Sequence, residues 1–223
     1  SGGYFRKLKQ GAYELSGEVY YKWMQNQIDY RNGADILVNQ YIEGELLFGK
    51  GRAYGLEVMA RKNTGRLTGW IGYTLSRTER RIEGINNNAW YCARQDRTHD
   101  ISVVGTYELN EHWSFSALWT YNTGNAVTFP SGKYTVDDQV LFSYTARNAG
   151  RMPAYHRLDL SATLTRKWKK HESTWNFSLY NAYGRQNAYT ITFQENANDP
   201  TRTSAIKTSL FRWVPSISYG FTF

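Results

Sequence analysis

Large apolar side chains recur at every second position along most of this chain, with small or polar side chains between them. The closing stretch, residues 217–223, is the simplest case, and its large side chains are Ile217, Tyr219, Phe221 and Phe223. Because successive side chains of a β-strand point to opposite faces, this spacing predicts a strand with one apolar and one polar face.

The same alternation predicts six earlier strands and the end of a seventh. The predicted strands cover residues 13–28, 52–62, 67–77, 101–109, 113–121 and 157–166, and residues 4–8 form the end of an incoming strand. In the first long strand Leu15 and Val19 share one face, whereas Glu14, Glu18 and Lys22 share the other. Charged groups are costly in a dry core, so we expect the polar face to meet a wet lumen or a polar plug.

Short and long connections alternate between the predicted strands. The short ones are 9–11, 63–66, 110–112 and 167–172, and the long ones are 29–51, 78–98 and 123–155. Transmembrane β-barrels of outer membranes have short periplasmic turns and longer extracellular loops. The alternation therefore predicts an all-β, antiparallel transmembrane barrel whose long connections lie outside the cell.

The last fifty residues allow two interpretations. Residues 173–195 form one long strand with an irregularity near 183–186, or two strands that turn there. Residues 204–223 form one strand bent at Pro215, which cannot donate to a ladder, or a hairpin. The two-hairpin interpretation makes 196–203 an unusually long periplasmic turn, so we favour eight long strands, with ten as the alternative. Both counts leave Phe223 on the periplasmic side.

Composition agrees with a barrel and excludes membrane-spanning helices. Hydrophobic residues make up 41% of the chain and the mean hydropathy is −0.63, so no run approaches the roughly 20 apolar residues of a helical span. Aromatic residues reach 16%, which suits the girdles at the two membrane interfaces. We treat 1–223 as one barrel segment. It opens directly on strand residues without a signal peptide, and this favours a fragment whose first strand begins upstream.

Charge and cysteine usage suggest few further partners. The net charge of +8 comes from Lys and Arg residues spread over turns and loops, so we do not expect nucleic-acid binding. The single Cys92 cannot form an intrachain disulfide, and no residues have metal-ligand spacing. No metal or cofactor is expected.

One charged cluster raises the question of catalysis, and its members are Arg94, Asp96, Arg97, His99 and Asp100. An Asp/His pair could activate a water, as in the omptin proteases, which are ten-stranded barrels. That chemistry needs a second acidic pair across the barrel, which the sequence does not place. We favour an ion-paired start of a strand at the rim, and no enzyme activity.

Several motifs resemble the barrel of TonB-dependent outer-membrane receptors, especially those of Bacteroidetes. They span residues 49–58 (GKGRAYGLEV), 68–77 (TGWIGYTLSR), 97–100 (RTHD) and 125–132, followed by 177–189 (FSLYNAYGRQNAY) and the closing strand 211–223. The terminal aromatic strand, with Ile217, Tyr219, Phe221 and Phe223, also resembles the signal read by the barrel assembly machinery of the outer membrane.

This resemblance implies a 22-stranded barrel in a Gram-negative outer membrane, filled by an N-terminal plug. The plug takes energy from an inner-membrane TonB complex through a short contact box. The present chain has neither plug nor box, so it would form only the C-terminal third or so of such a barrel. The implied function is energy-coupled uptake of a ligand too large or too scarce for porins.

Ligand contacts would come from the long connections and the upper lumen. Loop aromatics and arginines are common at binding surfaces, and the candidates are Trp90, Tyr91, Arg94, Asn122, Asn125, Tyr144 and Arg147. Ordinary loop packing explains the same residues. Siderophore, cobalamin, glycan and peptide ligands all stay open, and the basic charge hints at an anion. The alternatives are a small self-contained barrel serving as a passive pore or structural protein, and then a barrel protease.

Overall fold

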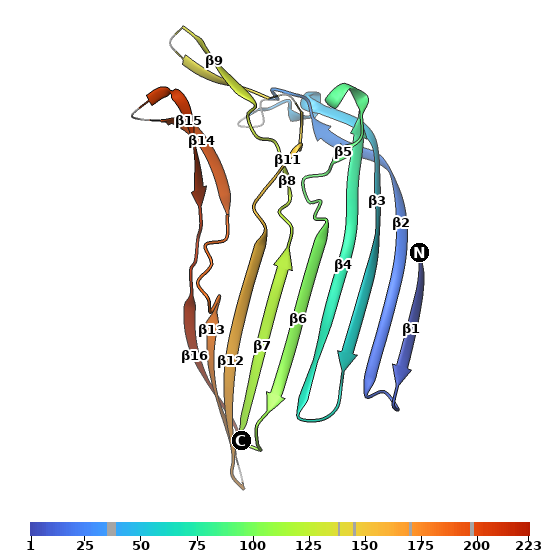
Figure 1. The fold of residues 1–223 in the computed structure, drawn as a ribbon, viewed down its shortest axis with the longest axis vertical. Helices are drawn as coiled ribbons and strands as arrows, with labels where there is room; N and C mark the ends of the chain where they lie inside the picture. Colours follow the sequence, from blue (N-terminus) through green and yellow to red (C-terminus); the bar gives the residue numbers. More distant parts are fainter. Residues whose placement is uncertain (35–38, 138, 145, 170, 197–198) are drawn as a thin grey trace.

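The structure, a computed structural model, describes residues 1–34, 39–137, 139–144, 146–169, 171–196 and 199–223 (Figure 1). One large antiparallel sheet dominates it, and its strands follow one another in the order β1, β2, β3, β4, β6, β7, β12, β13 and β16, with the short β5 attached to β4. The chain is therefore all-β and antiparallel, as predicted.

The strands of this sheet are long. They are β1 (Gly2–Leu8), β2 (Tyr13–Tyr30), β3 (Leu46–Lys62), β4 (Leu67–Ile82), β5 (Tyr91–Cys92), β6 (His99–Glu108), β7 (Trp113–Asn122), β12 (Tyr155–Lys167), β13 (Glu172–Tyr180) and β16 (Val214–Thr222). Two short 3-10 helices, η1 (Ile42–Glu45) and η2 (Asn86–Asn88), lie in the long connections. No helix among the described residues is long and apolar enough to span a membrane.

The tight turns explain how neighbouring strands reverse. In the first turn Lys9, Gln10 and Gly11 all adopt positive φ, and Gly11 N donates to Leu8 O at 3.1 Å. Gly65 has φ +90° in the turn between β3 and β4. Such left-handed residues match the twist of antiparallel strands. The short connections at one end of the sheet (Figure 1) are therefore those predicted.

Strands β3 and β4 run further toward the long connections than predicted. Residues 46–51 and 78–82, expected in loops, belong to these strands: the β3–β4 ladder extends to Gly49 and Ile82, and residues 46–48 pair with β2. At position 49 a Cβ atom would lie 2.2 Å from Arg81 O, so only glycine fits. The 17 residues of β3, at about 3.3 Å each, cover roughly 55 Å. That length exceeds the apolar band of an outer-membrane barrel, which is about 25 Å tall.

The long connection 123–155 contains its own small sheets. The strands β8 (Ala126–Val127) and β11 (Gly150–Arg151) pair with each other, as do β9 (Gly132–Val136) and β10 (Gln139–Ser143). Both lie at the end of the molecule that carries the long connections (Figure 1). The sequence predicted this connection as a loop and missed its hairpin.

The C-terminal region resolves the two interpretations left open. β14 (Thr190–Asn196) pairs with β15 (Asp199–Thr208) in a separate hairpin at the long-connection end (Figure 1), and β13 pairs with β16. The hairpins required for the ten-strand count, with 196–203 at the opposite end, are not formed. As the favoured interpretation predicted, the chain continues from β13 to the long-connection end and returns in β16. Both predicted long strands are interrupted, however, at 181–189 and at 209–213.

Asn181 connects the two irregular segments, 181–189 and 209–213. Its side chain is buried, its Nδ2 donates to Arg185 O at 2.9 Å and also to Arg212 O, and its backbone N–H donates to Asp159 Oδ1 at 2.9 Å. One amide thus binds backbone from both irregular segments. Because these carbonyls have left the ladder, the amide satisfies groups that would otherwise be unpaired.

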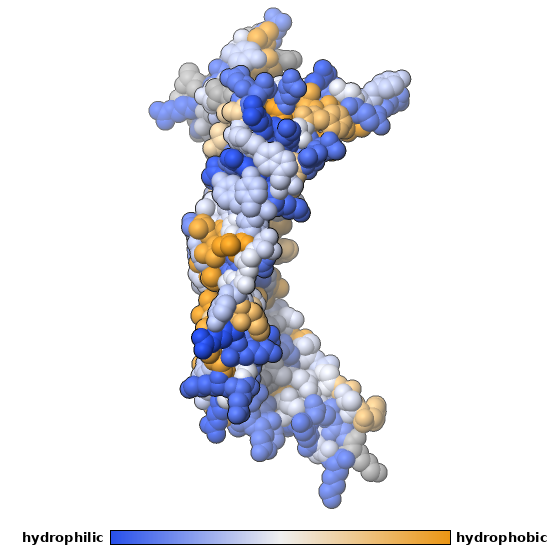
Figure 2. Space-filling model, turned by 90° about the vertical axis from the view of Figure 1, so that its right-hand side faces the viewer, coloured by the Kyte–Doolittle hydropathy of each residue, from blue (hydrophilic) through white to orange (hydrophobic). Residues whose placement is uncertain are grey.

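The sheet is a single layer with two different faces. Register places Leu15, Ala60, Ile71, Val103, Trp119 and Leu158 in one row across six strands. The next row on the opposite face holds Ser16, Met59, Gly72, Ser102, Thr120 and Arg157. We call the first the apolar face and the second the polar face. In the side view of Figure 2, hydrophobic residues gather along one side of the layer at mid-height.

The apolar face is uncovered. Leu15 is 42% exposed, Ile71 54% and Leu160 42%, although all three are large apolar side chains in mid-strand. The buried apolar residues of the described chain are instead few, and Ile82, Ile85 and Tyr91 cluster beneath the long connections. The described residues form an open sheet with β1 and β16 at its edges, and they do not form a closed barrel.

Candidate ligand-binding site

A cavity of about 870 Å³ lies at the long-connection end of the sheet. The end of β2, the end of β4, the 86–94 loop, the β9–β10 hairpin and residues 146–148 line it. Its walls combine three arginines with several aromatic rings, among them Arg80, Arg94, Arg147, Tyr30, Tyr134 and Tyr144. Concave sites that mix apolar surface with a few polar groups are typical ligand sites.

Arg147 fastens the 123–155 connection to two other loops. Its NH1 donates to Asp29 Oδ1 at 2.7 Å and to Tyr30 O at 2.5 Å, and its NH2 donates to Asn32 Oδ1 at 2.9 Å. Its backbone N–H donates to Asn86 Oδ1, and Asn86 Nδ2 returns a bond to Arg147 O. Most donors of this guanidinium are thereby occupied. Arg147 positions the cavity wall more than it offers a free cation.

The substitution Arg147→Ala is expected to loosen this wall. It removes three hydrogen bonds to the 29–32 segment, and bonds to charged groups contribute about 1.5–3 kcal/mol each. We expect amide hydrogen exchange in residues 29–34 and 123–154 to rise by about tenfold or more. Arg97→Ala removes an exposed arginine that forms no ion pair with a described residue, and should leave exchange unchanged. Equal protection in both variants would contradict the anchoring role.

Asp29 joins the same anchor to the buried cluster. Its Oδ2 accepts a hydrogen bond from Tyr91 Oη at 2.7 Å, while its Oδ1 accepts from Arg147. Tyr91 is only 6% exposed. Burial, and then the hydrogen bond to Asp29, raise the pKa of the Tyr91 phenol above its usual range. The phenol therefore stays protonated and keeps donating to Asp29.

A second anchor lies below the cavity, around Asp96. The Arg151 guanidinium donates to both the Asp96 carboxylate and the Asp96 carbonyl, and the fully buried carboxylate also accepts from Thr78 N at 2.5 Å. Arg151 NH2 lies 3.6 Å from Cys92 Sγ. Burial, and then the charge of Asp96, raise the pKa of the Cys92 thiol. The thiol is thus held in its neutral, unreactive form.

Arg94 is the freest cation of the cavity. It is exposed, and it forms no ion pair with any residue that the structure describes. Among the described residues, Arg80 donates to the Ile28 carbonyl alone, at 2.9 Å. A guanidinium presents five donors in a planar fork that suits carboxylates and phosphates. The cavity can therefore bind an anionic group between these two arginines, with Tyr30, Tyr134 and Tyr144 beside it.

The structure brings together some of the predicted ligand residues and separates others. Arg94, Tyr144 and Arg147 line the cavity, and Asn125 lies with Arg94 around a neighbouring hollow. Tyr91 supports the wall through Asp29. Asn122 ends β7 and pairs in register with Asp100 and Tyr155, outside the cavity. Trp90 lies on the apolar face, 5.9 Å from the Trp23 ring and 4.4 Å from the Arg52 guanidinium.

The predicted charged cluster does not assemble as a catalytic group. His99 Nδ1 lies 2.9 Å from Tyr73 Oη on the apolar face, whereas Asp96 is engaged with Arg151. Asp100, next to His99 in a strand, lies on the polar face. Of the cluster, Asp96 forms an ion pair, and its partner Arg151 comes from outside the cluster. Within the described residues, no group of three or more His, Cys, Asp or Glu could hold a metal ion.

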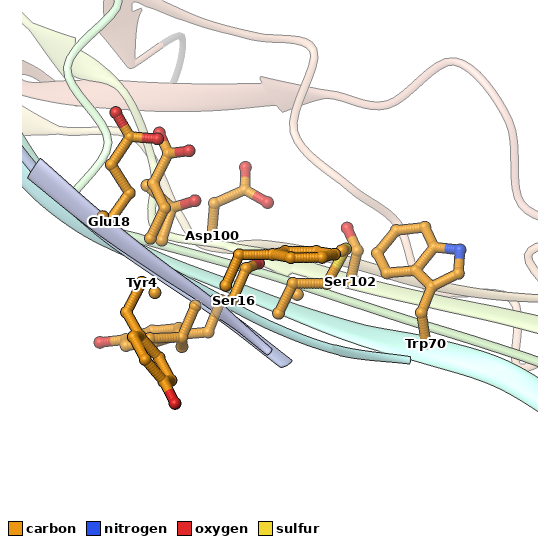
Figure 3. A pocket seen from close by; sticks show the side chains of 15 residues that line it. Tyr4, Ser16, Glu18, Trp70, Asp100 and Ser102 are labelled. Atoms are coloured by element: carbon orange, nitrogen blue, oxygen red, sulfur yellow. The ribbon is translucent and has the colours of Figure 1, made fainter. Parts of the chain in front are cut away.

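A second hollow, of about 480 Å³, lies over β1 to β6 near mid-sheet. Glu18 and Glu57 are register partners there, and Asp100 follows two strands further along the same row. Figure 3 shows Glu18 and Asp100 projecting from one side of the sheet and Tyr4 from the other. None of these three acids forms an ion pair with a described residue. Like charges directly opposite one another are destabilising, so this surface suits water or a basic partner.

Sequence reasoning missed several cavity residues. Arg80 was assigned to a loop although it lies within the extended β4, two residues before its end, and Tyr134 and Phe142 belong to the β9–β10 hairpin. The run Lys133–Val136, the acidic pair at 137–138 and the run Val140–Phe142 are a hairpin signal that was available. Asn148 was not recognised either, although its Nδ2 donates to Cys92 O at 2.9 Å.

A scan against protein-family models finds no match, and no curated protein matches the chain in sequence.

Proposed function

We propose that this chain forms part of the wall of a transmembrane β-barrel in a Gram-negative outer membrane, and that the assembled protein is a TonB-dependent receptor for energy-coupled uptake. One observation carries the proposal: the large sheet has an apolar face that no second layer covers in the described structure. Monomeric soluble proteins rarely expose contiguous apolar patches larger than a few hundred Å². A lipid bilayer accommodates such a face without a second layer.

The open edges support a larger barrel. β1 and β16 each have one neighbour in the sheet, so each presents a row of backbone groups on its other side. Unpaired backbone groups cost several kcal/mol each in hydrocarbon, which is why membrane sheets close. In the proposed receptor, further strands complete the barrel between these two edges. The 22 strands implied by the sequence resemblance provide them.

The polar face fits the interior of such a barrel. Glu18, Glu57 and Asp100 would face a hydrated lumen or a plug, where their charges keep water or polar partners. The TonB complex would act through a plug that lies outside this chain. Residues 1–223 would supply wall, loops and the terminal aromatic stretch for the barrel assembly machinery, with Ile217, Tyr219 and Phe221 in β16 and Phe223 directly after it.

The cavity at the long-connection end supports ligand capture from outside the cell. Arg80 and Arg94 would bind an anionic group, while the tyrosines beside them would contact an aromatic or apolar part. A siderophore, cobalamin, a glycan and a peptide differ in these properties. Of these four, an anionic siderophore or an acidic peptide matches the arginines best.

Uptake assays separate this function from a passive pore. Cells carrying the full-length protein would be given a radiolabelled ferric siderophore, cobalamin, an acidic peptide and an oligosaccharide. At least one should accumulate, and accumulation should stop when TonB is deleted or the proton gradient is collapsed. Uptake that continues without TonB would contradict the receptor and favour a passive pore.

The substitution Arg94→Gln is expected to weaken binding of the transported anionic ligand by about tenfold or more, because a hydrogen bond to a charged group is lost. Arg66→Gln removes an exposed arginine from the turn at the other end of the sheet and is the matched control. Calorimetric titration of the purified protein with the ligand that accumulates in cells measures both. Equal affinity in the two variants would exclude Arg94 from the site.

A further inference from the structure

Four basic side chains gather on the apolar face, at the ends of β3 and β4 that lie nearest the long connections. They are Lys50, Arg52, Arg77 and Arg81, which we call the basic cluster. Register pairs Lys50 with Arg81 and Arg52 with Glu79, while Arg77 is the partner of Tyr54. These positions alternate in phase with Leu56 on β3 and Leu75 on β4, so all four project from the same face.

Along the strands toward the long connections, the side chains of the apolar face change in type, and the basic cluster comes last. Val19, Leu56 and Leu75 share one aliphatic row. Next toward the long connections come the stacked rings of Tyr21 and Tyr54, with centroids 6.1 Å apart. Trp23 and Trp90 follow, and the Arg52 guanidinium lies 4.4 Å from the Trp90 ring. An aliphatic, then aromatic, then basic order is the order met on passing from hydrocarbon to charged headgroups.

Within the basic cluster one carboxylate is shared by two arginines. Glu79 is 6% exposed and accepts from Arg52 NH2 at 2.7 Å and from Arg77 Nε at 3.1 Å. The terminal nitrogens of Arg77 have no partner among the described residues. Arg81 gives its Nε to Asn88 O, and the exposed Lys50 forms no ion pair with a described residue. Four cations against one carboxylate leave a local excess of positive charge.

We propose that the basic cluster is a binding site for the phosphate of an anionic lipid headgroup in the outer leaflet. This inference rests on the proposed function, since it requires the apolar face to contact lipid with the long connections outside. Charge complementarity selects the occupant, because a phosphate can take two donors from a guanidinium fork and one from the Lys50 ammonium. Trp23 and Trp90 would hold the boundary between acyl chains and headgroup. Ile28 and Phe48, beyond the cluster, mark the base of the loops.

Native mass spectrometry of the full-length protein in detergent can test this site. The probes are bisphosphorylated lipid A, monophosphoryl lipid A and zwitterionic phosphatidylethanolamine. Lys50→Gln/Arg81→Gln removes two exposed cations and spares the arginines on Glu79. Each basic contact contributes about fivefold in affinity, so the double variant should bind bisphosphorylated lipid A roughly 25-fold more weakly.

Lys22→Gln is the matched control, because Lys22 lies at nearly the same height on the polar face, beside Ala53 in the register. It removes a positive charge without touching the apolar face, and should leave lipid binding unchanged. Unaltered binding by the double variant, or an equal loss in Lys22→Gln, would overturn the site. A protein that stays monodisperse without detergent would instead overturn the membrane location, so the two failures are distinguishable.

Discussion

The substitution Val103→Arg is expected to destabilise the assembled protein in a bilayer by about 2–4 kcal/mol, whereas Ser102→Arg should leave its stability nearly unchanged. Val103 lies in the apolar row between Ile71 and Trp119, and Ser102 lies in the polar row between Gly72 and Thr120. The two positions are adjacent in β6 but face opposite media. An arginine near the middle of the lipid face must be stripped of water or must distort the bilayer.

Folding into liposomes, followed by the heat-dependent shift in gel mobility and by urea titration, measures this difference. Because the two faces meet different media, Val103→Arg should lower the urea midpoint and Ser102→Arg should leave it unchanged. The reverse order would place the polar face against lipid. Equal and large losses in both variants would indicate that both faces are packed, as in a soluble two-layer protein.

The substitution Arg151→Ala is expected to unfold the rim below the cavity, at a cost of about 3–5 kcal/mol. Its partner Asp96 has no exposed side-chain surface. Removing one member of a buried pair leaves an uncompensated charge in a poorly hydrated site, which costs more than the pair itself contributes. Arg151 also donates to the Asp96 and Gly124 carbonyls, so two loops lose their link.

A double variant separates the orphaned charge from simple loss of contacts. Arg151→Ala/Asp96→Asn removes the charge and keeps an oxygen that can accept from Thr78 N. Hydrogen exchange of residues 91–98 and 123–128 should be fastest in the single variant and partly restored in the double variant. Identical exchange in the two variants would show that the charge of Asp96 is not the source of the effect.

Alternation alone predicted most of the main sheet. β2, β6, β7 and β12 lie within a few residues of their predicted ranges, because in these strands apolar and polar side chains alternate without a break. The outer ends of β3 and β4 were missed for a physical reason. There Lys50, Glu79 and Arg81 occupy positions in phase with the apolar face, so the strands continue but their apolar alternation is lost.

The cavity was harder to predict from the sequence than the sheet. Asp29 and Arg147 are 118 positions apart, and their bond depends on how two long connections fold over the sheet. Trp90 was predicted to face a ligand, but its neighbours Tyr91 and Cys92 pair with β4. This pairing places Tyr91 beneath the loops, and Trp90 packs against Trp23 on the apolar face. The general expectation of arginines and aromatics in the loops identified Arg94 and Tyr144, but no local pattern distinguished them from the others.

Spin labels along β4 test most directly whether the apolar face contacts lipid. Single cysteines would replace Leu67, Thr68, Ile71, Gly72, Thr74 and Leu75 of the full-length protein in liposomes, with Cys92→Ser as background. Collision with oxygen would be compared with collision with a water-soluble nickel chelate. We predict that labels at Leu67, Ile71 and Leu75 collide mainly with oxygen and labels at Thr68, Gly72 and Thr74 mainly with nickel. Positions shielded from both reagents on the apolar face, in a protein that stays monodisperse without detergent, would contradict the membrane location.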